Sequence, residues 1–496
     1  MKNKKVSTVS RRTALSWLAG AGAGLYAGGG RSLSRIGWAQ SSELPKFLIV
    51  FGCAGGASII DGPLAMRDGE VGQAGLNSFP DQDVDGDLIR ATQVTVDSLG
   101  GIPYRGTFDQ RDFVNQYRDQ MAVLTYTGTS VNHQIAQKRS LTGNEAWGGR
   151  TIQEAVASQF GQEYLLPNVN MATSGYAEAG HDPTLPAYAR AETISSPLLW
   201  PLGLHGTKGV TKEAQPQSSV IDKARAWRNQ ALDQNSHFMR TFASDTRIQR
   251  WLAHRNDTMP RFEELDLITR LNMLRDSPIV PLNEFGLGSA EDQMLLSRSF
   301  PNILTDPLEA QAALAYLLIS QGISVTVTIS PDFSPLVMRG SGQLVDSPPL
   351  AFDFSHQAHR ATQALMWSRM YSICHELISL LSQREFADGV SYWDRSMIYF
   401  ASEFGRTRVR PENATDFGTG HDLNNGALLI SPLIRGGQVY GGVDASTTKT
   451  FGFDPVTGTP TPGREMSEAE LFSAIAHGLN LDVGGVGLPT VTALRA

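Results

Sequence analysis

The chain has 496 residues, of which 41% are hydrophobic and 18% are charged, so it can bury a large core. This composition excludes a disordered or fibrous chain and predicts a globular protein of one large or two ordinary domains. Its formal charge is −7 at pH 7, and it becomes −14 without residues 1–39, which hold seven Lys or Arg and no Asp or Glu. Because an acidic surface repels phosphate backbones, nucleic acid is excluded as a partner, and a long anionic polymer would need a local basic pocket.

Residues 1–39 have the pattern of a twin-arginine export signal. A basic start and the pair Arg11-Arg12 precede an apolar, Gly/Ala-rich run over 14–27. That run is shorter than the ~20 residues that a membrane-spanning helix needs, and small residues indicate cleavage near Ala39. The pattern predicts a periplasmic or secreted protein that meets the twin-arginine translocase during export and has no stable membrane insertion. It divides the chain into the signal, 1–39, and one α/β domain, 40–496.

The rest of the chain alternates apolar runs with helical patterns. Continuous runs rich in Ile, Val and Phe predict buried strands at 46–56, 121–130, 323–330 and 396–404. Amphipathic or apolar helical patterns occupy 151–161, the long stretch from about 221 to 274, 306–322 and 361–383. We therefore expect an α/β fold, with a central, mostly parallel sheet between helices and long loop insertions at 62–111 and 175–211. Ligands of such sheets bind at the carboxyl ends of the strands.

Two cysteines, Cys53 and Cys374, are the only thiols of the chain. Two are too few for the disulfide framework of a small exported protein. The sequence leaves open whether they form a single disulfide or are two small buried side chains.

Polar residues that suit metal binding follow the predicted strands. They are Ser58 and Asp61 after the first run, Ser130, Asn132 and His133 after the second, Asp353, His356 and His359 at the start of a helix, and Glu403, Arg406 and His421 after the last. Carboxylates and neutral imidazoles that converge from separate strands suit zinc or a mixed pair of metals. An arginine beside them offers a planar fork for a tetrahedral oxyanion. Together they indicate metal-assisted hydrolysis of a phosphate or sulfate ester.

Each of these residues also has a structural interpretation. Asp61 can cap a turn, and His356 and His359 at i and i+3 can be solvated on one helical face. His133 can be an ordinary first-turn residue, and Glu403 with Arg406 can form a structural ion pair. Glu403 is the hardest to dismiss, because a carboxylate at the end of a buried strand needs a partner.

The combination of motifs resembles a known family. The motifs are the twin-arginine start, GGAS at 55–58 with Asp61, Asn132-His133 leading to TGN, SEFGRT at 402–407, the glycine-flanked His421 and IRGGQVYGG at 434–442. Together they resemble the domain-of-unknown-function family numbered 1501, which is placed in the alkaline phosphatase and sulfatase superfamily. The resemblance covers about 46–481, and SEFGRT with RGGQVYG is its most specific part.

The resemblance implies an alkaline phosphatase-like α/β fold with one or two divalent metal ions at the carboxyl edge of the sheet. Zinc is the expected ion, with calcium or magnesium as alternatives. By position, the metal ligands are Asp61, Asp353 with His356 or His359, Glu403 and His421. This chain departs from relatives in having Gly420 where they tend to have an aspartate, and in its longer spacing from Asp353 to His356.

The resemblance leaves the attacking group open. Counting back from Thr142-Gly143 places His133, and not a serine, near the nucleophile position of alkaline phosphatases. The nucleophile would then be a hydroxyl from Ser130 or Thr129, or a hydroxide with His133 as a ligand or a base. Arg406 would bind the nonbridging oxygens of the ester.

The leading hypothesis is an exported metal-dependent hydrolase that acts on a phosphate or sulfate ester, carried either by a small molecule or by a polymer. The alternative is a non-catalytic metal-binding or assembly protein of the same fold, which the missing serine motivates. A third hypothesis, a redox enzyme exported with its cofactor, lacks a dinucleotide fingerprint, since GCAGGASIID does not fit G-x-G-x-x-G.

Overall fold

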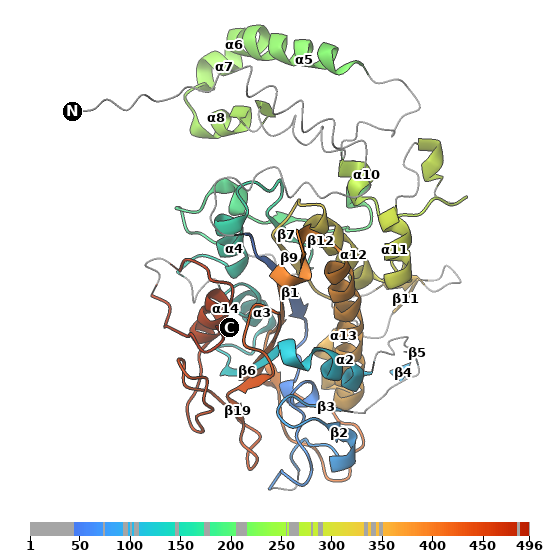
Figure 1. Cartoon of the computed structure of the whole chain (residues 1–496), viewed down its shortest axis with the longest axis vertical. Coiled ribbons are helices and arrows are strands. Elements are labelled where there is room, and N and C mark those ends of the chain that lie inside the picture. The colour runs from blue at the N-terminus through green and yellow to red at the C-terminus, as the bar shows by residue number, and fades with distance from the viewer. Residues whose placement is uncertain are drawn as a thin grey trace, which may run out of the picture.

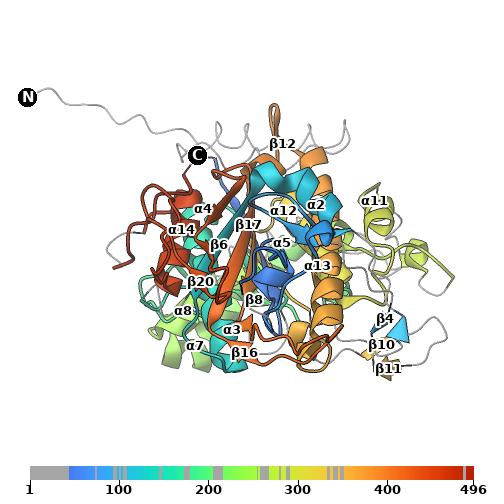
Figure 2. The same cartoon turned by 90° about the horizontal axis from the view of Figure 1, so that it is seen from below.

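Strand β1 (Phe47–Cys53) lies inside a mixed α/β fold (Figures 1 and 2). The structure, a computed structural model, describes residues 44–72, 75–92, 98–99, 102–103, 109–143, 148–172, 179–204, 216–253, 255–256, 267–278, 281–285, 291–331, 336–338, 344–346, 351–483 and 487–495. All seven residues of β1 are buried, because strands on both sides pair with it and helices cover both faces.

The central sheet is large and mostly parallel. Its strand order is β18 (Gln438–Tyr440), β6 (Met121–Thr127), β17 (Asn424–Ile430), β14 (Ser396–Ser402), β1, β9 (Thr326–Ile329), β7 (Asn168–Asn170) and β8 (Glu192–Thr193). Every pairing is parallel except the two that β17 makes, with β14 and with β6. Since β17 runs back from the end of β14, the segment that joins them stays at the carboxyl edge of the parallel strands.

Helices cover both faces of this sheet. On one side lie α2 (Gln110–Tyr117), α12 (Pro307–Ser320) and α13 (His359–Gln383), and on the other lie α3 (His133–Thr142), α4 (Ile152–Phe160) and α14 (Glu468–Gly478) (Figure 2). Two of them begin with a capping box, in which Thr151 or Ser467 and the glutamate three residues later satisfy free backbone N–H groups.

The structure confirms the predicted α/β class and the four predicted strands. Three of the predicted helices are also present, as α4, α12 and α13. The predicted helical stretch from 221 to 274 is instead divided into α5 (Ser218–Trp227), a π-helical turn (Arg228–Leu232), α6 (Asp233–Asn235), α7 (His237–Phe242), α8 (Thr246–Ala253) and α10 (Leu267–Leu271). Ser236 breaks it, because its extended backbone ends α6 and its hydroxyl caps α7.

The two cysteines are separate, buried thiols. Burial raises the pKa of both, so each remains protonated and behaves as a small apolar side chain. The predicted export signal lies outside the described residues. Within the described part of the chain, no helix combines the length and the apolar character that crossing a membrane requires.

Candidate metal centre

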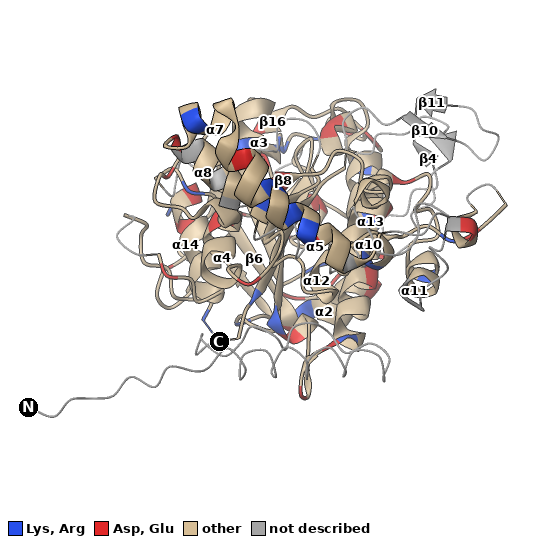
Figure 3. Cartoon of the chain, turned by 90° about the horizontal axis from the view of Figure 1, so that it is seen from above, with Lys and Arg blue, Asp and Glu red and all other residues tan. Residues whose placement is uncertain are grey.

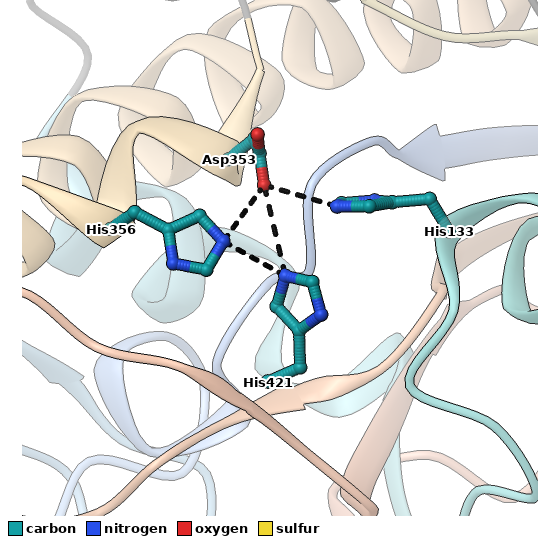
Figure 4. A group of neighbouring side chains, drawn as sticks. All are labelled: His133, Asp353, His356 and His421. Carbon is teal, nitrogen blue, oxygen red and sulfur yellow. Dashed lines mark hydrogen bonds and ion pairs between the residues drawn. The ribbon is translucent and has the colours of Figure 1, made fainter.

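Four side chains that could hold a metal ion meet at the carboxyl edge of the sheet (Figure 4). They are His133, Asp353, His356 and His421, and one ligand atom from each lies within 4.8 Å of all the others. Asp353 Oδ1 is 3.4 Å from His133 Nε2, 3.5 Å from His356 Nε2 and 4.0 Å from His421 Nε2. The Nε2 atoms of His356 and His421 are 2.9 Å apart.

Different parts of the fold supply the four side chains. His133 is the first residue of α3, shortly after β6 ends. Asp353 and His356 belong to the 3-10 turn η10 (Phe352–His356), which precedes α13. His421 starts β16 (His421–Asp422), which pairs with β15 (Gly405–Arg406) just after β14.

Gly55 permits η10 to lie this close to the end of β1. It has φ +90°, and a Cβ there would lie 2.0 Å from the backbone nitrogen of Asp353. Any other residue would push Asp353 away from the three imidazoles, so this glycine meets a requirement for space as well as for conformation.

Hydrogen bonds orient two of the three imidazoles toward the centre of the cluster. His133 Nδ1 lies 3.0 Å from Glu403 Oε2, and His421 Nδ1 lies 2.8 Å from the carbonyl oxygen of Val131. Since both partners are acceptors, each Nδ1 carries the proton and donates it. When these rings are neutral, each Nε2 therefore presents a lone pair to the cluster, as metal-binding histidines do.

Electrostatics differ between these two histidines. The hydrogen bond with Glu403 raises the pKa of His133, against the opposing effect of burial. Burial, with Arg406 and the other two histidines nearby, lowers the pKa of His421 to about 4. His421 is therefore neutral at pH 7, and its Nε2 can offer a lone pair to a cation in place of its contact with His356.

Glu403 lies behind His133 and is not one of the four clustered groups. Its carboxylate, with 0% exposure, accepts the backbone N–H of Gly55 and the Nδ1–H of His133. Burial raises the pKa of Glu403, although the hydrogen bond with His133 acts in the opposite direction. The sequence predicts Glu403 as a metal ligand, whereas its contacts are those of a residue that orients a ligand or a base.

Arg406 is fully buried, and its guanidinium binds the protein itself. It donates to the carbonyl oxygens of Gly55, Gly56, Phe352 and Thr419, and to Asp353 Oδ1 at 3.3 Å. Burial lowers the pKa of Arg406 to about 10. The sequence predicts that Arg406 binds a substrate oxyanion. In the structure its guanidinium donors instead bind η10 and Asp353 and hold them in place.

Asp61 and His359, both predicted as metal ligands, form a second and fully buried polar group. His359 Nε2 lies 2.9 Å from Asp61 Oδ2, and His359 Nδ1 lies 2.9 Å from Thr419 Oγ1. The amide of Asn77 donates to both oxygens of Asp61. Of the two histidines between which the sequence cannot choose, it is therefore His356 that joins the four-residue cluster.

The Asp61–His359 pair should make stability depend on pH. Burial alone raises the pKa of Asp61, but the charge of His359 and hydrogen bonds from His359, Ser58 and Asn77 bring it below the ordinary value. Ionised Asp61 then stabilises the fold above its unfolded pKa of about 4, and this contribution is lost as pH falls through the lower folded pKa. We expect Asp61→Asn to reduce the free energy of unfolding by about 3 kcal/mol at pH 7 and by progressively less below pH 4.

Urea denaturation of the wild type and of Asp61→Asn at pH 7, 5, 4 and 3 measures this difference. Asp119→Asn, at an exposed position, is the control and should change little at any pH. A loss that stays constant from pH 7 to pH 3 would show that the carboxylate charge is not what stabilises the pair.

The two hydroxyls predicted as nucleophiles lie outside the four-residue cluster. Ser130 Oγ accepts the backbone N–H of Asn132 at 3.1 Å, in a local turn before α3. Thr129 Oγ1 donates to the carboxylate of Glu468, 3.0 Å away. His133 is the member of the cluster that sequence reasoning placed among the catalytic residues, with metal binding as the alternative. The sequence feature that pointed to His133 was its position at the start of a helix that follows a buried strand.

The fold and the site together define a mixed α/β protein with a candidate histidine–carboxylate metal centre at the carboxyl edge of its sheet. No protein-family model matches the chain, and no curated protein matches it. Among solved structures, one match is the chain titled "Crystal structure of Ps i-CgsB in complex with k-i-k-neocarrahexaose", with 8% identity and a TM-score of 0.34 over 90% of this chain and 75% of that one. A TM-score this low assigns neither a fold family nor a function.

Proposed function

We propose that this chain is an exported, metal-dependent hydrolase that acts on a phosphate or sulfate ester and has an alkaline phosphatase-like fold, as its resemblance to family 1501 implies. The supporting observation is the cluster of three imidazoles and one carboxylate, two of whose imidazoles have Nδ1 occupied and Nε2 directed inward. The cluster lies at the carboxyl edge of a mostly parallel sheet, where ligands of open α/β sheets bind.

The donor set fits zinc. Zinc bonds to nitrogen and oxygen are about 2.0–2.1 Å long, so neighbouring ligands of a tetrahedral ion lie roughly 3.3 Å apart. Four of the six separations are 2.9, 3.4, 3.5 and 4.0 Å, which surround that value, and all lie within 4.8 Å. Neutral imidazoles with one carboxylate also favour zinc over calcium or magnesium, which take mainly oxygen ligands.

We assign Asp353, His356 and His421 as the residues that hold the ion. Three protein ligands are typical of catalytic zinc sites, because they leave a position for substrate. Zinc bound there would act as a Lewis acid on an ester oxygen. His133 donates its Nδ1–H to Glu403, and its Nε2 would accept a proton from the water that displaces the ester oxygen. Arg406 would keep Asp353 in position through its hydrogen bond to Asp353 Oδ1.

A specific observation favours the alternative, a non-catalytic metal-binding protein. His133 Nε2 is as close to Asp353 as His356 Nε2 is, so all four groups together could fill a tetrahedral shell. A closed shell of four protein ligands is typical of structural zinc. Ser130, Thr129 and Arg406 all form hydrogen bonds within the protein. This observation agrees with the non-catalytic alternative.

Metal analysis and ester hydrolysis of one preparation test the proposal. We expect the protein exported by its own twin-arginine route to hold about one equivalent of zinc per chain, measured by inductively coupled plasma mass spectrometry. It should hydrolyse p-nitrophenyl phosphate or p-nitrophenyl sulfate, lose this activity on chelation and regain it with zinc. Zinc without any turnover would support the non-catalytic alternative. A folded protein that binds no zinc, calcium or magnesium would contradict both.

A further inference from the structure

The helices α5 to α8 form a unit that projects from the sheet-containing body. Figure 1 shows them together at one end of the molecule, beyond α4 and α10. We call the described residues 216–253 and 255–256 the helical arm. Its middle and last parts are tied together, since Arg255 near its end forms an ion pair with Asp233 and donates to Asn229 Oδ1 at 3.1 Å. The arm is therefore an internally bonded unit.

The arm differs in charge from the rest of the protein. Residues 216–256 hold seven Lys or Arg and three Asp or Glu, a formal charge of +4. The remainder of the chain from residue 40 onward holds 28 basic and 46 acidic residues, a formal charge of −18. Figure 3 shows Lys and Arg spaced along α5. A basic unit on a strongly acidic protein creates a long-range attraction for surfaces like that of its own body.

The arm also exposes large apolar side chains on several of its helices. Trp227 is 61% exposed, Trp251 51%, Phe238 50% and Phe242 47%. Phe238 and Phe242 lie one helical turn apart on α7, with ring centroids separated by 5.2 Å. Exposed aromatic rings beside arginines have the composition of the energetic centre of a protein–protein interface. Arg255 lies over the ring of Trp251, 4.6 Å from its centroid, so an arginine and an exposed aromatic ring are adjacent in the arm.

We propose that the helical arm binds the acidic body of a second copy of this chain. In the resulting symmetric dimer, the arm of each chain contacts the body of the other. The charge of the whole chain favours a second copy over other anionic partners of the arm. An anionic lipid surface or a polyanion would attract the arm but would repel the −18 body to which the arm is joined. A second copy instead presents that acidic body as the complement of the arm, and a twofold arrangement lets both arms bind.

Sedimentation velocity and light scattering of the full-length protein test the proposal. We expect a particle of twice the mass of one chain at 0.1 M salt, and weaker association at 0.5 M salt because the charges are screened. The double variant Phe238→Ser/Phe242→Ser should raise the dissociation constant of the dimer at least about tenfold. The double variant Lys223→Glu/Arg240→Glu should do the same.

Matched controls lie outside the arm. Leu304→Ser removes an apolar side chain that is 63% exposed, and Lys449→Glu reverses an exposed charge, so neither should affect the dimer. Circular dichroism confirms that each variant is folded. A monomeric wild type, or a dimer that the arm variants leave unchanged, overturns the proposal. A monomer that binds vesicles of anionic lipid through the arm would overturn it in favour of a membrane surface.

Discussion

Replacing His421 by alanine should release the metal, whereas replacing His133 by alanine should leave it bound and stop hydrolysis. Both predictions follow from the assignment of His421 as a ligand and His133 as the group that transfers a proton. His421 is neutral, and its Nε2 lies 2.9 Å from that of His356. We expect its removal to weaken zinc binding by at least about 100-fold, more than is usual for residues that only orient a ligand. Activity should disappear with the metal.

His133→Ala should behave differently. Loss of general acid–base catalysis lowers kcat by about 10²–10⁴-fold, while zinc remains near one equivalent per chain. The measurements are metal content by mass spectrometry and initial rates with the ester that the wild type prefers. His477→Ala, in α14, is the control and should change neither quantity.

The pair of variants also separates the two functions. If His133 is a fourth ligand in a closed structural site, His133→Ala will lose zinc to nearly the same extent as His421→Ala. That outcome would contradict the proton-transfer role and favour the non-catalytic alternative. Loss of hydrolysis with retained zinc cannot arise from a structural site, because a structural site has no hydrolysis to lose.

Much of the fold could be predicted from the sequence, because strands buried on both faces need continuous apolar runs. The four runs that predict strands are now β1, β6, β9 and β14. Strand β7, by contrast, consists of three residues, Asn-Val-Asn, and owes its conformation to its neighbours β9 and β8. Such a strand has no local signal, since its stability comes from tertiary pairing.

The four clustered residues are all among those that the sequence predicted, but the sequence did not show which of the predicted residues would meet. His356 and His359 at i and i+3 would share a face if one helix contained both. However, His356 ends η10 and His359 begins α13, with Ala358 between them in a non-helical conformation at φ −141° and ψ 82°. The two rings therefore join different groups. A break of this kind depends on how η10 packs against Gly55, which the spacing of two histidines does not reveal.

For Arg406 and Glu403 too, the sequence predicts the residues but not their partners in the fold. The sequence places a guanidinium and a carboxylate after a buried strand, but it does not say which of their neighbours are already bonded. In the fold, Arg406 is enclosed by carbonyl oxygens and Glu403 by Gly55 and His133. Residue type thus indicated candidate residues, while the contacts in the fold determined which of them face the centre of the cluster.

Glu403→Gln should lower hydrolysis by about 10–100-fold without loss of the fold. The glutamine carbonyl can still accept the N–H of Gly55, so that buried donor remains bonded. Its amide, however, would donate to His133 Nδ1 and force the imidazole proton onto Nε2, the atom that faces the cluster. The proton-transfer role of His133 would then fail in the neutral ring. Because burial already raises the pKa of Glu403, a neutral side chain at this position removes an unfavourable buried charge.

Thermal unfolding, zinc content and the pH dependence of kcat/KM test this prediction together. We expect a melting temperature at or above that of the wild type, unchanged zinc and a displaced pH profile, since the raised pKa of His133 depends first on its bond with Glu403. Glu403→Ala is the contrasting variant, because it leaves the N–H of Gly55 buried without that acceptor and should destabilise the fold by about 1–3 kcal/mol. If Glu403→Gln releases zinc instead, Glu403 is itself a metal ligand, as the sequence alone predicts, and a rearrangement must bring its carboxylate past His133 when the ion binds.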